Sequence, residues 1–159
     1  MSIISARIDF RLLHGIVATQ WAPMSGAQRV MVIDDRVAND PVIKESMRLG
    51  KPAGMACSII TEETPRKNFK AGKYDSHKVF VVTEDPRILV HLEEDGQKIP
   101  EVIVGTTRSI DEGTKVSKRA AIKDEDKPVY KQLLDNGSKV LVKFVPSDKD
   151  IPLANKIDL

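Results

Sequence analysis

A single histidine near the N-terminus stands among residues that suit phosphoryl chemistry. His14 follows an apolar run, 3–8, and precedes a helix-like run, 16–21, and Arg7, Asp9 and Arg11 lie within seven residues of it. A neutral imidazole is a nucleophile near pH 7, since its ordinary pKa is about 6.5. Planar guanidinium groups match the oxygens of a phosphoryl group. The segment therefore predicts His14 as a phosphoryl acceptor, although a histidine in a turn can also be purely structural.

The neighbours of His14 suggest how it would be assisted. Arg11, three residues earlier, can bring its charge to the phosphoryl group, whereas Arg7 either binds and orients that group or faces solvent. Asp9 can accept a hydrogen bond from one imidazole nitrogen, which leaves the other nitrogen free to attack. Gly15 permits close backbone approach, and the first amides of the following helix can point at phosphoryl oxygens.

The elements that position these residues alternate along the whole chain. Apolar runs predict strands at 3–8, 29–34, 55–61, 78–83, 101–105 and 139–145. Helices are predicted at 15–24, 41–50, 62–71, 84–94 and 124–136. Residues 119–122 suggest an outlying strand, 106–118 a long surface loop and 151–159 a tail. The pattern predicts a single α/β domain over residues 1–159, a three-layer open sheet, mostly parallel, with helices on both faces.

Parallel strands gather their carboxyl ends along one edge of a sheet, where ligands bind. The residues at those ends are polar. Besides the segment 9–14, they predict a site rim made of Asp34, Asp35, Thr83 and Thr106. For the two aspartates, helix capping or turn formation is the alternative interpretation, and we favour it.

Composition limits the other functions. The net charge is +2, from 25 basic and 23 acidic residues, which gives no argument for nucleic acid as a partner. One cysteine excludes an internal disulfide and a cysteine-based metal site, so we expect no metal and no cofactor. No apolar run approaches the ~20 residues that span a bilayer, and the N-terminus lacks a signal peptide. We therefore expect a cytoplasmic chain with no direct membrane insertion.

Other residues that could do chemistry have less support. The chain contains neither GxxxxGK[ST] nor GxGxxG, which argues against common nucleotide kinases and dinucleotide enzymes. His77 stands at the amino end of a strand, and His91 lies inside a predicted helix. Cys57 is expected to be a buried, inert thiol, and Trp21 a core residue of the first helix.

Two long motifs resemble a known family. The run 7–21, RIDFRLLHGIVATQW, resembles the signature RIDDRLIHGQVxxxW of the IIB components of the mannose/fructose/sorbose family of the bacterial sugar phosphotransferase system. The run 30–40, VMVIDDRVAND, is similar to that family's VVDDxVAND segment. The resemblance continues through 104–105, 118–120 and 145–147, and so covers nearly the whole chain.

The resemblance implies a function. A IIB protein takes a phosphoryl group from a phosphohistidine of the IIA protein, and the carrier histidine matches His14, with Arg11 as the assisting arginine. It passes the group to a sugar held by the membrane IIC/IID transporter, without using a nucleotide. The resemblance also implies a mainly parallel sheet of about seven strands, and attachment to the inner face of the membrane only through the transporter.

Three residues depart from the family pattern. Phe10 replaces an aspartate, Ile16 a glutamine and Thr106 an asparagine. These departures motivate the alternative of a non-catalytic, degenerate IIB-like module that only docks or regulates. A histidine phosphatase is a weaker alternative, because that chemistry uses an Arg-His-Gly core and Leu13 precedes His14 here.

Overall fold

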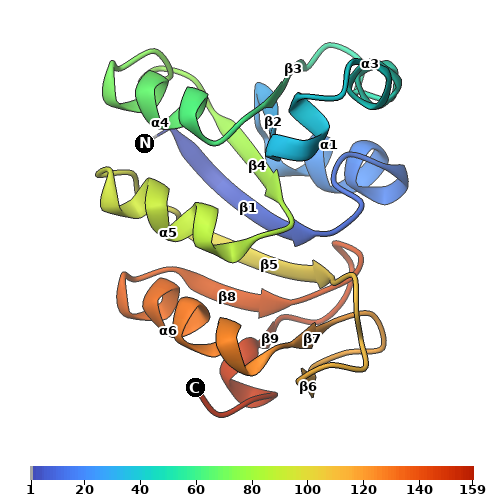
Figure 1. Cartoon of the computed structure of the whole chain (residues 1–159), viewed down its shortest axis with the longest axis vertical. Helices are drawn as coiled ribbons and strands as arrows, with labels where there is room; N and C mark the ends of the chain where they lie inside the picture. The colour runs from blue at the N-terminus through green and yellow to red at the C-terminus, as the bar shows by residue number, and fades with distance from the viewer. Residues whose placement is uncertain (1) are drawn as a thin grey trace.

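The protein is built on one seven-stranded sheet, seen in a computed structural model that describes residues 2–159 (Figure 1). The strand order is β3-β2-β4-β1-β5-β8-β9, and every neighbouring pair is parallel except β8 and β9. The strands are β1 (Ile3–Asp9), β2 (Arg29–Ile33), β3 (Ala56–Ile60), β4 (Val79–Thr83), β5 (Glu101–Thr106), β8 (Lys139–Val142) and β9 (Ile151–Pro152). The predicted open, mostly parallel sheet is confirmed.

Helices cover both faces of this sheet, as predicted. One face carries a π-helical turn (Val17–Trp21), α1 (Ala22–Ser25) and α2 (Asp35–Ala38), with α3 (Pro41–Leu49) at its edge. The other face carries α4 (Glu63–Lys70), α5 (Pro86–Glu94) and α6 (Lys127–Asp135). Each face buries its own apolar cluster, which gives three layers. No helix among residues 2–159 is both long and apolar enough to cross a bilayer.

Local sequence explains the central elements. All five residues of β4 are buried, because helices cover both of its faces and Val, Phe and Thr suit that environment. The helix predicted from residue 41 begins there: the Asp40 carboxylate accepts hydrogen bonds from the backbone N–H groups of Val42 and Ile43, and Pro41 takes the first helical position.

The chain after residue 105 differs from the prediction in three places. The predicted tail, 151–159, is wrong: it contains β9 and a 3-10 helix (Leu153–Asn155), and it buries Leu153 and Ile157 in the core. The predicted loop 106–118 contains β6 (Thr114–Lys115), which pairs with β7 (Ala121–Ile122) in a separate two-stranded sheet. The last parallel strand ends at Val142 instead of residue 145. Such two-residue strands form through pairing between distant segments, which local periodicity cannot report.

Candidate functional site

His14 lies in the loop that leaves the carboxyl end of the central strand β1. The loop turns sharply at Leu12, whose φ of 61° is in the left-handed region that favours glycine. The Leu12 side chain is buried, and its backbone N–H donates to the Asp9 carbonyl at 3.1 Å. Backbone strain held in place by burial is concentrated at functional loops. Helical turns begin at residue 15, directly after His14, and include the π-helical turn.

The fully buried Asp9 carboxylate organises the loop. Its Oδ1 accepts hydrogen bonds from the Arg11 backbone N–H at 2.9 Å and the Thr106 hydroxyl at 2.8 Å, and it lies 3.1 Å from His14 Nε2. Its Oδ2 accepts a hydrogen bond from Arg7 Nε at 3.1 Å. The contact between Asp9 and the imidazole is the one that the sequence suggested. It leaves Nδ1 as the ring nitrogen that Asp9 does not engage.

Arg7 is fully buried, so the alternative in which it faces solvent is wrong. Its Nη1 donates to the Lys143 carbonyl at 3.1 Å, and its guanidinium carbon lies 4.8 Å from the centre of the Trp21 ring. Burial lowers the pKa of Arg7, and the negative charge of Asp9 opposes that effect. The arginine is therefore placed to orient Asp9 from beneath the loop. Trp21, buried as predicted, donates its Nε1–H to the Phe144 carbonyl at 2.8 Å.

Gly105 makes room for this buried arginine. A Cβ at Gly105 would lie 2.2 Å from Arg7 Cζ, so no larger residue fits there without moving the guanidinium. Sequence reasoning placed Gly105 at the end of a predicted strand and in the family resemblance, but it did not predict that Gly105 makes room for Arg7. The sequence also did not predict that the Lys143 and Phe144 carbonyls accept hydrogen bonds from Arg7 and Trp21, because every residue type has a backbone carbonyl.

The remaining loop residues are accessible. The His14 side chain is 15% exposed, and Arg11 and Gly15 are exposed. The Arg11 guanidinium has no hydrogen bond or ion pair with any of residues 2–159, so it is available to an incoming anion. Gly15 has a φ of 26°, and a Cβ there would meet nothing within 4 Å. The edge beside His14 is therefore open, with one free arginine.

The predicted rim residues divide into two groups. Thr106 lies opposite Asp9 in the β1–β5 register and contacts it, so the hydroxyl supplies a hydrogen-bond donor at this departure from the family pattern. The other three have different partners. Asp34 accepts from the Val37 backbone N–H at the start of α2, and Asp35 accepts from the Glu62 backbone N–H. The favoured interpretation of both aspartates as capping or turn residues fits these contacts.

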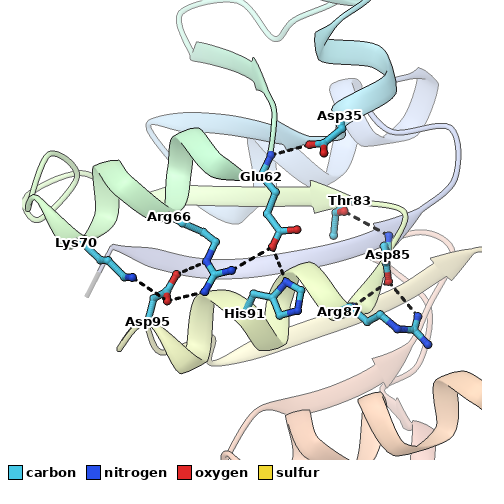
Figure 2. Close-up of polar contacts among 9 residues, drawn as sticks. All are labelled: Asp35, Glu62, Arg66, Lys70, Thr83, Asp85, Arg87, His91 and Asp95. Carbon is cyan, nitrogen blue, oxygen red and sulfur yellow. Dashed lines mark hydrogen bonds and ion pairs between the residues drawn. The ribbon is translucent and has the colours of Figure 1, made fainter.

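Thr83 also turns to a local partner: its hydroxyl accepts the backbone N–H of Asp85 at 3.3 Å (Figure 2). Within residues 2–159, no hydrogen bond or ion pair joins Asp34, Asp35 or Thr83 to His14. The structure thus brings Thr106 to the Asp9 carboxylate that contacts His14, whereas Asp34, Asp35 and Thr83 contact backbone groups at helix starts and loops.

The other two histidines and the cysteine lie elsewhere. His91, on α5, contacts the Glu62 carboxylate between α4 and α5 (Figure 2). His77 precedes β4 at the amino edge of the sheet. Cys57 is expected from the sequence to be buried, but it is only half-buried. Its partial burial raises the pKa of its thiol. Across residues 2–159 no three His, Cys, Asp or Glu side chains are grouped to hold a metal ion.

Fold and site together define an open α/β protein with a partly exposed histidine at the carboxyl edge of its central strand. Its imidazole is oriented by a buried carboxylate, and a free arginine stands three residues away. This arrangement is compatible with the phosphoryl chemistry that the sequence predicts for His14, and the sequence contains no nucleotide-binding loop.

Comparison with known proteins gives the family. The chain matches the family described as "PTS system sorbose subfamily IIB component" over residues 3–158, and it belongs to this family. It is 29% identical to the fructose-specific EIIB component of Bacillus subtilis, with 93% of this chain and 91% of that protein covered. It is 31% identical to the mannose-specific EIIAB component of Escherichia coli, covering 99% of this chain and 50% of that protein.

A solved structure agrees over the whole chain. The IIBSor domain of the sorbose permease from Klebsiella pneumoniae superposes with a TM-score of 0.91 at 27% identity, covering 99% of this chain and 97% of that one. The fold that the sequence resemblance implied, a mainly parallel sheet of about seven strands, is therefore confirmed.

Proposed function

We propose that the chain is the phosphoryl carrier of a sugar phosphotransferase system, with His14 as the residue that is phosphorylated. The observation that carries the proposal is the contact of His14 Nε2 with the buried Asp9 carboxylate, which fixes the ring and leaves Nδ1 free at an open edge. Membership in the IIB family supplies the reaction class. The fusion in the E. coli mannose-specific EIIAB component supports IIA as the donor.

In the first step, Nδ1 of His14 attacks the phosphorus of the donor's phosphohistidine. The new N–P bond forms as the bond to the donor imidazole breaks, and that imidazole leaves. Arg11 balances charge on the transferring oxygens, together with the backbone N–H groups that open the helix after Gly15. The Nε2 proton stays on the side of Asp9, whose charge stabilises the phosphorylated ring.

In the second step, a sugar hydroxyl attacks the same phosphorus and loses its proton to solvent, and the bond to Nδ1 breaks, which returns neutral His14. The sugar is held by the IIC/IID membrane transporter, to which the chain docks from the cytoplasm as a single domain. No nucleotide or other cofactor takes part directly. Arg7 and Asp9 serve both steps as positioning residues, since Arg7 cannot reach the open edge from beneath Gly105.

The experiment is phosphorylation with enzyme I, the general histidine carrier protein, phosphoenolpyruvate and a cognate IIA protein. We expect one acid-labile phosphate per chain, located at His14 and absent from His14→Ala. His77→Ala and His91→Ala, which remove the other two histidines, are expected to keep the label. Label that persists in His14→Ala, or an acid-stable phosphate, contradicts the assignment.

The alternative is a non-catalytic module that docks to the transporter without carrying phosphate. It is favoured by Phe10, which stands where the family has an aspartate and lies 5.5 Å from the Arg108 guanidinium carbon. That alternative predicts no label on the wild-type chain when the same IIA protein is fully phosphorylated and labels a functional IIB protein.

A further inference from the structure

A basic hollow of about 370 Å³ lies where the carboxyl end of β8 meets the β6–β7 sheet and the C-terminal segment. We call it the basic hollow, and define it by its charged lining residues: Lys118, Arg119, Lys143, Asp148, Lys149 and Lys156. Five of these side chains are cationic and one is anionic. The positive charge gathered here exceeds the net charge of the entire chain, +2.

Most of this charge has no internal partner. Lys143 pairs with Asp150 at 2.8 Å, whereas Lys118, Arg119, Lys149 and Lys156 form no ion pair with any of residues 2–159. Four of the other eight arginines and six of the sixteen lysines form ion pairs. What distinguishes this surface is that four cations unpaired within the described part of the chain line one hollow.

Among residues 2–159, the one carboxylate that lines the hollow, Asp148, accepts hydrogen bonds from the backbone. Asp148 Oδ2 accepts the backbone N–H groups of Phe144 at 2.9 Å and Val145 at 3.0 Å. These backbone hydrogen bonds hold the pKa of Asp148 below its usual range. Asp148 therefore serves the turn after β8, and its negative charge also attracts Lys143 and Arg119, with which it forms no ion pair.

Arg119 is held in place to bind an anion. Its guanidinium carbon lies 3.8 Å from the centre of the Phe144 ring, and its carbonyl accepts the Thr107 backbone N–H at 3.0 Å. Stacking fixes the plane of the guanidinium while its N–H donors remain free for a carboxylate or phosphate. The floor beneath it is apolar, made by Val142, Phe144 and Ile151.

Two backbone carbonyls of the hollow's lining residues also contact the residues that support the His14 loop. The Phe144 carbonyl accepts Trp21 Nε1–H, and the Lys143 carbonyl accepts Arg7 Nη1–H. In Figure 1 the chain that follows β8 rises beside the chain that leaves β1, at the carboxyl edge of the sheet. A protein large enough to reach His14 would therefore also lie over the basic hollow.

We propose that the basic hollow is the docking site for an acidic surface segment of the protein that donates the phosphoryl group to His14. This inference rests on the proposed carrier function and adds the chemistry that selects the donor. Complementary charge speeds encounter and fixes orientation, and its effect weakens as salt is added.

Two other occupants fit less well. A bilayer surface is flat and cannot fill a concave site with an apolar floor, although its anionic headgroups would attract the cations. The cytoplasmic loops of a membrane transporter carry an excess of Lys and Arg, which would be repelled here. A soluble protein with protruding Asp or Glu side chains is the occupant that matches both shape and charge.

The test compares two triple variants with equal charge change. The hollow variant is Lys118→Glu, Lys149→Glu and Lys156→Glu, all exposed and unpaired. The control variant is Lys73→Glu, Lys78→Glu and Lys98→Glu, which are exposed residues before β4 and β5, at the opposite edge of the sheet. Two quantities are measured with the cognate IIA protein: the second-order rate constant of His14 labelling by the phosphorylated form, and the Kd of the unphosphorylated form by calorimetry.

We expect the hollow variant to lose about tenfold or more in both quantities at about 25 mM salt, and the difference to shrink near 0.5 M. The control variant should stay within about twofold of the wild type, since its charges face away from the partner. The final labelled fraction should be complete in all three proteins, because the carrier chemistry is intact.

Equal values for the hollow and control variants would overturn the docking site. Binding of the wild type to phosphatidylserine vesicles, lost only in the hollow variant while donor binding is unchanged, would assign the surface to the membrane instead. If the wild type is never labelled by an active donor, the proposed function fails, and the Kd values of the two variants still decide the docking site.

Discussion

At the scale of single residues, the site is organised around one buried charge. Asp9 is fully buried and compensated on two sides, by the Arg7 guanidinium and by the N–H and O–H donors of the loop and β5. Removing one partner of a buried ion pair costs about 3–5 kcal/mol, because the other charge is left unpaired. The Arg7–Asp9 ion pair therefore stabilises the loop, and through Asp9 it also fixes the orientation of the His14 imidazole.

The orientation of the His14 ring predicts which of its two nitrogens is phosphorylated. Because Asp9 Oδ1 lies 3.1 Å from Nε2, we expect the phosphoryl group on Nδ1. The measurement is ¹⁵N–³¹P coupling or long-range ¹H–¹⁵N NMR on the phosphorylated, histidine-labelled protein. Phosphorus bonded to Nε2 would mean that the contact with Asp9 breaks before transfer.

Gly105 gives a second prediction at this scale. Gly105→Ala places a Cβ 2.2 Å from Arg7 Cζ, so the guanidinium must move away from Asp9. We expect the free energy of unfolding to fall by about 1–3 kcal/mol, as in other overpacked sites, and His14 labelling to slow. Urea unfolding and labelling rates measure both effects.

Gly50→Ala is the matched control for this substitution. A Cβ there would lie 3.5 Å from the Met47 carbonyl, which is an ordinary contact at the end of α3. We expect that variant to be neutral or stabilised by about 0.4–1 kcal/mol. If Gly105→Ala behaves like Gly50→Ala, Arg7 does not need its present position.

At the scale of elements, α4 and α5 are joined by an ion pair at the end of α5. Asp95 follows α5 and accepts two hydrogen bonds from Arg66 of α4, at 2.6 and 2.9 Å, and Lys70 lies 3.3 Å away (Figure 2). The hydrogen bonds from Arg66 lower the pKa of Asp95 below its ordinary value of 3.8. Folding therefore favours the ionised carboxylate.

The sign of this shift fixes a pH dependence. A carboxyl group with a lowered folded pKa contributes stability above its unfolded pKa and loses it as the pH falls through the folded value. We expect Asp95→Asn to unfold at lower urea than the wild type above pH 3.8, with the difference closing at lower pH. Asp111→Asn, at an exposed position, should show no such trend. A difference that persists at low pH would assign the effect to packing.

The elements that sequence predicted are those with a local cause. Continuous Val and Ile runs identified β2, β4 and β5, and the Asp40–Pro41 pair gave the start of α3. Besides the four-residue helix α2, the sequence missed the strands β6 and β9, which are two residues long and exist only through their pairing partners. Their short apolar positions, such as Leu153 and Ile157, carry no period that separates them from a tail.

The same distinction holds for the site. His14, Asp9 and Arg11 lie within one loop, so their proximity follows from the chain itself. The burial of Arg7 depends on Gly105 and on a carbonyl 136 residues away, which no local pattern reports. The alternation of side chains along β1 places Arg7 on one face of the sheet. It does not show that Trp21 covers Arg7 on that face.

At the scale of the whole molecule, the His14 loop is anchored to the most protected strand. β1 lies between β4 and β5 at the centre of the sheet, and helices cover both faces of the sheet. The hollow beside it is lined by the segment 116–119, which connects the two-residue strands β6 and β7, and by Ile151 of the two-residue strand β9. The His14 loop is therefore attached to the central strand, whereas the hollow is built from short elements near one end of the sheet.

This arrangement predicts an uneven pattern of amide hydrogen exchange. Local opening costs little at edges and approaches the global free energy of unfolding in a central core. We expect amides of β1, β4 and β5 to exchange about a hundredfold or more slowly than those of β6, β7 and β9, as measured by mass spectrometry or NMR under native conditions. The amides of β8, which has a parallel neighbour on one side and β9 on the other, should be intermediate. If β9 is protected as strongly as β1, the C-terminal segment is part of the cooperative core, and the basic hollow is as rigid as the His14 loop.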